Sequence, residues 1–346
     1  MMVSLGWAAL LAISGLGLPA SSELKYRMFD LGPGQRGRMA GLSVNSSGWI
    51  VGDTRNGPGW YWRPDVGWRQ FPTPPGGEFT NGVSINDSCQ VACYVVIAGL
   101  KHAAVWNPDS GIHVIQMPEK LRLLDVISIG RQGKMVGQCL DKTTSAAHAW
   151  LYDPLIGTID LGMAPDGDTT AARHVNDAGV VAGWHREPGW NYSANLWTPD
   201  GKFIDLGHPP LGGVYVYGIN NAGDLALQAA TIGVPEDARW HSGEWVSFGR
   251  IAGTNQEWAV FALTDQRWAF GTAFFDGADR AVIWRPGFGS RFIDEYVDDS
   301  KTGYTIHAVY SASKNGLLSG SASKPGDRFT RPVLFVPYPK KSAGDL

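Results

Sequence analysis

The stretch His174–His208 reads HVNDAGVVAGWHREPGWNYSANLWTPDGKFIDLGH. An apolar strand pattern ends at Val175, and the polar segment 176–179 (NDAG) follows it as a tight turn. Further strand patterns cover 180–183, the residues leading to Trp197, and 203–206, with a second turn at 198–201 (TPDG) before the last. The stretch therefore predicts one antiparallel meander of four short strands.

The rest of the chain repeats this meander. The first turn and its flanking strands recur as VNSSGWIVGD, INDSCQVACY, IGRQGKMVGQ, VNDAGVVAGW, INNAGDLALQ, LTDQRWAFGT and ASKNGLLSGS. These turns start at residues 45, 86, 130, 176, 220, 264 and 313, so successive copies lie 41, 44, 46, 44, 44 and 49 residues apart. An aromatic residue near the end of each third strand follows the same period: Trp62, Trp106, Tyr152, Trp197, Trp240, Trp284 and Phe335.

Four short strands in about 45 residues are the pattern of one β-propeller blade. Residues 25–32 (KYRMFDLG) match the fourth strands at 158–162 (TIDLG) and 203–207 (FIDLG), whereas the seventh copy has no fourth strand after Tyr338. We therefore expect an all-β chain that forms a seven-bladed β-propeller of four-stranded antiparallel blades. The N-terminal strand closes its last blade, which removes exposed sheet edges.

The turns have a chemical explanation. Asn or Asp opens a turn by hydrogen bonding to its own backbone, and a glycine three residues later adopts positive φ without steric cost. Positive φ is therefore expected at Gly179 and Gly223. Calcium loops also combine Asn, Asp and Gly, but they need several carboxylates and the third copy reads GRQG. We interpret the segments as hairpin turns, and the repeated aromatic residues as packing between sheets rather than ligand platforms.

Three pairs of segments resemble a known repeat. INDSCQV with HAAVW at 102–106, MVG with HAW at 148–150, and VNDAGVVAG with FIDLG resemble the HAF repeat of extracellular proteins. That repeat has the pattern INxxGxVVG, then HAFxW, then xDLG. The resemblance covers nearly all of residues 25–338 and implies a propeller-like repeat protein in an extracellular setting. It brings no shared activity or catalytic residues.

Composition and the N-terminal segment define the general class. With 44% apolar and 18% charged residues the chain is globular, and a net charge of −3 without long like-charge runs indicates no nucleic-acid partner. Residues 1–20 resemble a signal peptide, and an uncleaved anchor is the alternative, since Lys25 is the first basic residue. The expected organisation is a signal peptide at 1–20, the seven-repeat propeller at 25–338 and a C-terminal tail at 339–346. The protein is expected to be a monomer, secreted or periplasmic, without a membrane span after signal removal.

Cysteines and histidines indicate no cofactor or metal. Three cysteines leave two interpretations open: a disulfide, Cys89–Cys93 or Cys93–Cys139, or buried small residues. The eight histidines show no metal-ligand spacing, and the chain has neither a Gly-x-Ser-x-Gly elbow nor a phosphate-binding glycine loop before a helix. We therefore expect no cofactor.

Binding residues are expected on the loops that join second to third strands, because these vary between copies whereas the N-x-x-G turns are uniform. We call the side of the expected ring that carries these loops the loop face, and the side that carries the N-x-x-G turns the turn face. On the loop face, five residues combine charge with aromatic area, as a sugar or peptide site would need: His185, Arg186, Glu187, Trp190 and Tyr192. Arg173 and His174 replace the apolar and serine residues of other first strands, and would point into the central channel or between blades. An ordinary solvated loop and a polar channel are the plain alternatives.

Three functions remain open. The preferred hypothesis is an exported, non-enzymatic protein that binds a glycan, peptide or cell-envelope protein through the loop face. The second is a propeller enzyme of glycosidase or lyase type that uses Arg173, His174, Asp125 and Glu257 at the channel. A structural or assembly role is the third, and the fold alone does not choose among them.

Overall fold

The computed structural model describes residues 24–32, 40–53, 57–165, 167–189, 191–208, 212–229, 238–254 and 258–339. These residues form strands β1 to β28 and two short 3-10 helices, η1 (Ile293–Glu295) and η2 (Asp299–Lys301). The expected all-β fold is confirmed for this part of the chain. The signal-peptide segment 1–20, Trp190, Glu257 and most of the C-terminal tail lie outside the described residues.

Most strands belong to four-stranded antiparallel sheets that follow the chain order. The first contains β2 (Ala40–Val44), β3 (Ile50–Asp53), β4 (Trp60–Arg63) and β5 (Gly67–Gln70), and the second β6 (Gly77–Ile85), β7 (Val91–Ile97), β8 (Leu100–Asn107) and β9 (Gly111–Val114). Two later sheets contain β18 (Val214–Ile219), β19 (Leu225–Ala229), β20 (Ala238–His241) and β21 (Glu244–Ser247), then β22 (Ala259–Leu263), β23 (Ala269–Phe275), β24 (Ala278–Arg285) and β25 (Gly289–Phe292).

Between these pairs lies an eight-stranded sheet made of two such meanders. Its strands are β10 (Leu121–Ile129), β11 (Met135–Asp141), β12 (Ala147–Asp153), β13 (Gly157–Gly162), β14 (Thr169–Val175), β15 (Val181–Arg186), β16 (Tyr192–Trp197) and β17 (Phe203–Gly207). The two halves are joined only by one parallel bridge, Ala147 to Thr169. Strands β14 to β17 are the meander that the sequence 174–208 predicts.

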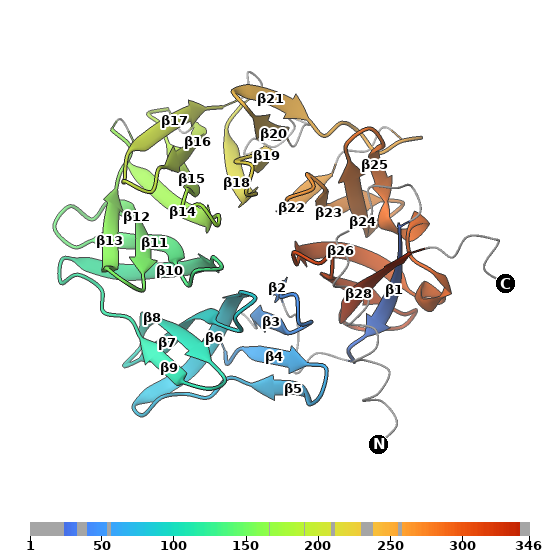
Figure 1. Cartoon of the computed structure of the whole chain (residues 1–346), viewed down its shortest axis with the longest axis horizontal. Coiled ribbons are helices and arrows are strands. Elements are labelled where there is room, and N and C mark those ends of the chain that lie inside the picture. The colour runs from blue at the N-terminus through green and yellow to red at the C-terminus, as the bar shows by residue number, and fades with distance from the viewer. Residues whose placement is uncertain are drawn as a thin grey trace.

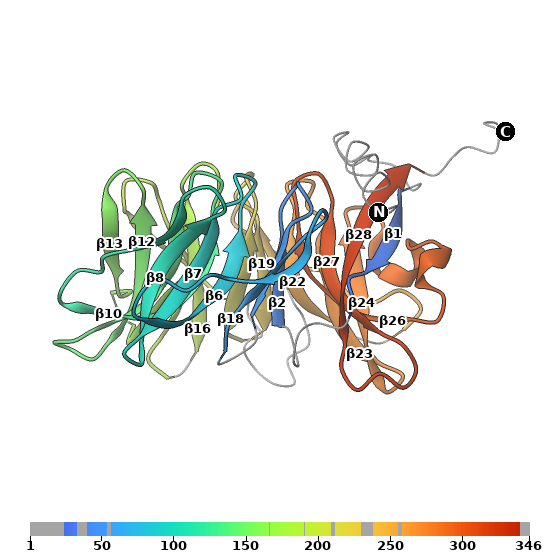
Figure 2. The same ribbon diagram turned by 90° about the horizontal axis from the view of Figure 1, so that it is seen from below.

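The last sheet combines both ends of the described chain. It contains β26 (Thr305–Ala312), β27 (Leu318–Ser323), β28 (Arg331–Pro339) and, as its outermost strand, β1 (Leu24–Asp30). β1 pairs antiparallel with β28 from Leu24–Pro339 to Asp30–Val333, and Figure 2 shows the two strands side by side. Tyr26 is fully buried in this sheet.

The sheets are arranged around a central axis in chain order, with β14, β18, β22 and β26 nearest the axis (Figure 1). The core lies between neighbouring sheets. In one cluster, Leu42 and Trp62 of the first sheet pack with Leu334 and Val336 of the last. Repeated aromatic residues whose side chains the structure describes join these clusters, as expected: Trp197 is 2% and Phe335 0% exposed.

The N-x-x-G turns hold neighbouring sheets together in a way that the sequence did not indicate. Each Asn side chain accepts hydrogen bonds from its own turn through Oδ1, as expected, and Asn45 receives them from Ser47 and Trp49. Its Nδ2 donates to the Asn86 carbonyl of the next turn at 3.2 Å. We call these turn-to-turn bonds the turn clasp; the equivalent donors include Asn86, Asn176 and Asn220, and Asn315 joins the last turn to the first at the Ser46 carbonyl.

Backbone conformation agrees with the turn chemistry. Gly179 and Gly223 have φ of +80° and +83°, which confirms the expected positive values. Two copies keep this conformation without glycine, since Cys89 has φ +56° and Arg267 φ +65°. Arg267 Nε donates a hydrogen bond to Oδ2 of the buried Asp224 at 2.8 Å. The three cysteines are free thiols, with Cys93 and Cys139 buried.

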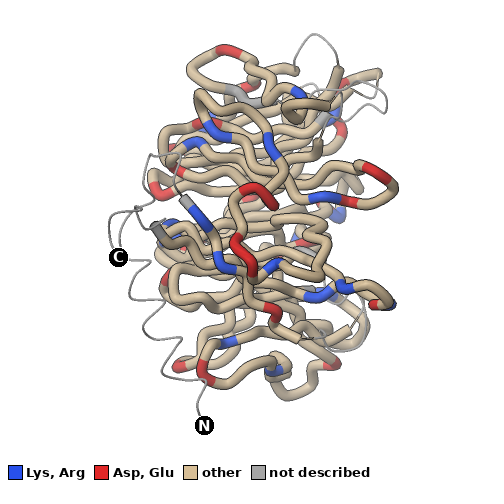
Figure 3. Tube along the Cα trace, turned by 90° about the vertical axis from the view of Figure 1, so that its right-hand side faces the viewer, with Lys and Arg blue, Asp and Glu red and all other residues tan. Residues whose placement is uncertain are grey.

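The described residues include no helix long and apolar enough to cross a membrane. Acidic and basic residues are interspersed over the side of the molecule shown in Figure 3, where neither sign dominates. This distribution agrees with the near-neutral net charge.

Candidate functional site

An aromatic cluster lies on the loop face between β15, β16 and β18. The Trp184 ring centroid is 5.3 Å from that of Tyr192 and 5.2 Å from that of Tyr215, and both contacts are edge-to-face. The rings of Tyr192 and Tyr215 are 4.6 Å apart. All three side chains are partly exposed, so their rings form an accessible surface. We call these residues the loop-face cluster.

Arg186 borders the loop-face cluster and is held in one orientation. Its Nε and Nη2 donate to the two Asp168 carboxylate oxygens at 2.6 and 2.7 Å. The Arg186 hydrogen bond lowers the pKa of Asp168, and burial raises the pKa of Tyr215, reinforced by its hydrogen bond with Tyr192. A bidentate Arg–carboxylate pair fixes the guanidinium plane.

The structure brings together only some of the residues proposed from the sequence. Tyr192 and Arg186 share the loop-face cluster. The His185 side chain is instead buried, with 4% exposure, against residues of its own sheet. Its Nδ1 lies 3.3 Å from Asn195 Oδ1, and its ring packs against that of Phe203. The His185 ring is therefore not part of the exposed surface, and Trp190 is outside the described residues.

Trp184 and Tyr215 were missed by the sequence reasoning. Trp184 precedes His185 in the stretch 174–208. The alternation of side chains along a strand does not show which neighbouring sheet Trp184 faces. Tyr215 belongs to the next copy, 44 residues after Ala171, so only the arrangement of neighbouring sheets brings it to Trp184. The sequence signal that could have found this cluster is that adjacent copies both carry an aromatic residue, Trp184 in one and Tyr215 in the next.

Arg173 and His174 lie on β14, away from the loop-face cluster. The Arg173 guanidinium carbon is 5.6 Å from the Tyr217 ring centroid. Burial lowers the pKa of Arg173. Burial first, and Arg173 second, lower the pKa of His174 to about 3, so this imidazole is neutral at physiological pH. Asp125, proposed as a channel acid or base, is 3.7 Å from Lys101 Nζ.

A cavity of about 210 Å³ opens on the turn face, where the turns of different sheets meet around the axis. Its walls are the apolar residues that end the inner strands, among them Val44, Ile129, Val175 and Leu263. Asp87, Asp177, Arg131 and other turn side chains surround it: Asp265, Asn221 and Lys314. The sequence placed candidate sites on the loop face and did not indicate this cavity.

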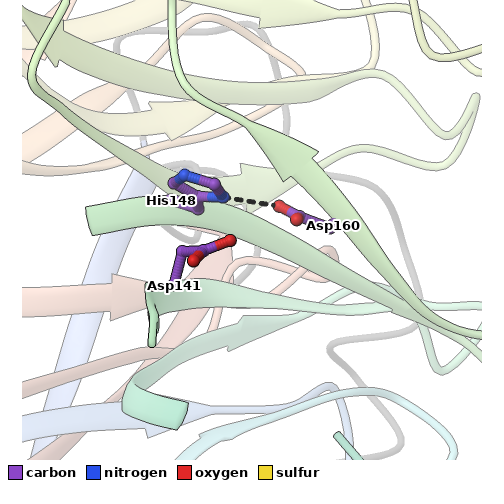
Figure 4. Close-up of side chains that lie close together, drawn as sticks. All are labelled: Asp141, His148 and Asp160. Atoms are coloured by element: carbon purple, nitrogen blue, oxygen red, sulfur yellow. Dashed lines mark hydrogen bonds and ion pairs between the residues drawn. The ribbon is translucent and has the colours of Figure 1, made fainter. Parts of the chain in front are cut away.

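Figure 4 shows a third cluster, in which Asp141, His148 and Asp160 come from three consecutive strands, β11, β12 and β13. One possible ligand atom from each lies within 4.8 Å of the others. His148 Nδ1 is 3.0 Å from Asp160 Oδ1, and Lys120 Nζ is 2.7 Å from Asp160 Oδ2. A second group of this kind contains His185, Glu187 and Asp205.

The first of these groups is already neutralised by its own surroundings. Asp141 accepts hydrogen bonds from the backbone N–H groups of Thr143 and Thr144, which lower its pKa. Burial acts to raise the pKa of Asp160, but hydrogen bonds led by that of Lys120 outweigh it and the pKa is lowered. Oxygen and imidazole ligands suit several divalent metals, but the Lys120 ammonium occupies the position that a cation would take at Asp160.

No family model and no curated protein sequence matches the chain. Solved structures do. The chain is similar to a streptogramin B lyase (TM-score 0.56, 13% identity, 92% of this chain and 99% of that one). It is also similar to an oligogalacturonate lyase in complex with manganese (0.59, 11%, 90% and 96%) and to YCF48 bound to the D1 peptide (0.50, 10%, 92% and 97%).

These likenesses define a fold class. The neighbours are β-propeller proteins, and this chain shares their fold over most of its length. Some of them are enzymes and others are binding proteins, and identities of 10–14% carry the fold alone.

Proposed function

We propose that this protein is an exported, non-enzymatic propeller of the HAF-repeat type that binds a peptide segment of a partner protein through its loop face. The repeat pattern supports the family, and residues 1–20 support export. Five four-stranded sheets, and an eight-stranded sheet divided at one bridge, correspond to the seven repeats. We infer a seven-bladed ring in which β1 closes the last blade.

The observation that carries the binding proposal is the loop-face cluster beside Arg186. Tyr, Trp and Arg are the residue types that dominate the energy of protein interfaces. The rings of Trp184, Tyr192 and Tyr215 pack against one another at interplanar angles of 78°, 78° and 47°, so they offer edges rather than the flat platform that a sugar ring needs. That geometry favours a peptide over a glycan. YCF48, which shares the fold, was solved with a peptide.

The test is selection of ligands from a random peptide library, with a glycan array in parallel. Tyr192→Ser and Arg186→Gln are expected to weaken selected peptides at least tenfold with little change in melting temperature. Phe274→Ala is the matched control, because Phe274 is a 64% exposed aromatic residue in another sheet's β23–β24 hairpin. Peptides that bind the Tyr192→Ser variant as tightly as the parent, or hits on glycans alone, would contradict the proposal.

The second candidate is a lyase that acts at the centre of the ring. The observation that favours it is the pair of a desolvated Arg173 and a neutral His174 on one inner strand, in a fold shared with two lyases. Incubation with a streptogramin B and with an oligogalacturonate, followed by mass spectrometry, tests it. Product formation that Arg173→Ala and His174→Ala abolish, while Tyr192→Ser does not, would replace the binding proposal.

A further inference from the structure

The inner strands share a β-bulge at one level. In the strand pairs β6–β7, β10–β11, β14–β15, β18–β19, β22–β23 and β26–β27, the register skips one residue near the turn-face end of the inner strand. A bulge leaves its extra residue unpaired and redirects that side chain. We call the six skipped residues the collar: Val83, Ile127, Arg173, Tyr217, Phe261 and Tyr310.

Collar side chains from consecutive sheets touch one another. The ring centroids of Tyr217 and Phe261 are 6.1 Å apart, and those of Phe261 and Tyr310 are 5.7 Å apart and nearly parallel. Arg173 lies over the outer face of Tyr217, at 5.6 Å. Every member is partly exposed, although each belongs to an innermost strand. The collar therefore lines the axis of the ring with three aromatic rings, two aliphatic side chains and one cation.

Arg173 is a cation on which Asp125 acts only through electrostatic attraction, without an ion pair. Among the described residues, no carboxylate forms an ion pair with it, and its buried Nε has no hydrogen-bond partner. The adjacent His174 is neutral, because its pKa is lowered to about 3, and Val83, Ile127 and Phe261 have no ionisable group. A buried donor of a cation that lacks a hydrogen-bond partner is costly unless an anion completes it. Elsewhere, Arg186 and Arg331 are both fixed by carboxylates.

We propose that the collar binds a small aromatic carboxylate, which pairs with Arg173 and stacks on Tyr217 and Phe261. A planar guanidinium matches a carboxylate with two parallel hydrogen bonds. One cation suits a monoanion, and the aromatic arc suits a flat apolar body. The turn-face cavity is a separate feature: it is lined by residues further along the inner strands, among them Val175 on β14, and by none of the collar residues.

The experiment is calorimetric titration of the full-length protein with benzoate, with benzamide as the neutral isostere and inorganic phosphate as a non-aromatic anion. Benzoate is expected to bind at millimolar or lower concentration, and benzamide and phosphate at least tenfold more weakly. Hippurate-type peptides ending in a free or amidated Phe distinguish a free acid from a chain terminus as the source of the carboxylate. Tighter binding of the free-acid peptide than of benzoate would assign the terminus.

Arg173→Met removes the charge at similar volume and should abolish benzoate binding without lowering the melting temperature, since it removes an unpaired buried charge. Arg173→Lys keeps a charge without the planar fork and should bind several-fold more weakly than the parent; it also serves if the Met variant does not fold. Arg69→Met, on the exposed outer strand β5, is the control. Equal benzoate affinity in the parent and Arg173→Met, or no binding to the parent at 10 mM (on the order of −3 kcal/mol), would overturn the proposal.

Discussion

The substitution Gly183→Ala tests the link between the glycine of the repeat and the bulge of the inner strand. A Cβ at Gly183 would lie 2.1 Å from the Ala171 carbonyl oxygen and 2.8 Å from Trp197 Cζ3. Carbon and oxygen atoms normally stay above 3.0 Å. The inner-strand carbonyl would therefore have to retreat by about 1 Å in a packed core, where such changes are not absorbed easily. Equivalent glycines have the same close contact, since a Cβ at Gly271 would lie 1.8 Å from the Ala259 oxygen.

We expect Gly183→Ala to lower the free energy of unfolding by about 2–4 kcal/mol, as overpacking in a core does. Gly201→Ala is the control: its φ of +86° gives an ordinary strain of about 1 kcal/mol, and a Cβ there would meet no atom within 4 Å. The assay is urea denaturation followed by tryptophan fluorescence, with midpoints compared at equal slope. If the midpoint of Gly183→Ala is not below that of Gly201→Ala, the explanation of this glycine by the bulge is wrong.

Three further outcomes are expected. Cys89→Gly should raise the melting temperature, because it removes left-handed strain of about 1 kcal/mol at φ +56°; a lower value would contradict this and show that the hydrogen bond from Asn45 Nδ2 to Cys89 Sγ, at 3.5 Å, outweighs the strain. Asn220→Ala should cost about 2 kcal/mol or more, because the buried amide bonds its own turn and the next one, whereas an effect near zero in urea denaturation would argue against the turn clasp. Burial acts to raise the pKa of Asp224, but hydrogen bonds from Asn220, His241 and Arg267 outweigh it and the pKa is lowered. The stability that this carboxylate contributes is therefore present above the pKa of an unfolded Asp, near pH 4, and falls as the pH drops below that value. Asp224→Asn should flatten the acid limb of a profile of melting temperature against pH.

The sequence predicts the local features of this fold well because turn chemistry is local. Asn176 and Gly179 specify a hairpin by contacts within a few residues, and the 44-residue period to Asn220 places the next one. The all-β propeller class, the buried aromatic residues and the positive φ at Gly179 were all accessible in this way.

The features that were not predicted depend on contacts between copies. The Nδ2 of Asn176 has no distinctive sequence signal for its bond to the Asn220 carbonyl. The loop-face cluster combines Trp184 with Tyr215 of the following sheet. Aligning the repeats column by column would have grouped the collar residues, but their meeting around the axis follows from the radial arrangement of sheets. The left-handed backbone at Cys89 was also not predictable, because no glycine stands at that position of the turn.

Because β1 pairs with β28, the last sheet can be completed only late in synthesis. Asp30 leaves the ribosome about 300 residues before its partner Val333, so β1 is among the first strands made and among the last to find its place. Until then Tyr26 and Met28, both buried in the finished sheet, have no core to enter. The late arrival of its partner strand keeps the last sheet incomplete until nearly all of the described chain has been made.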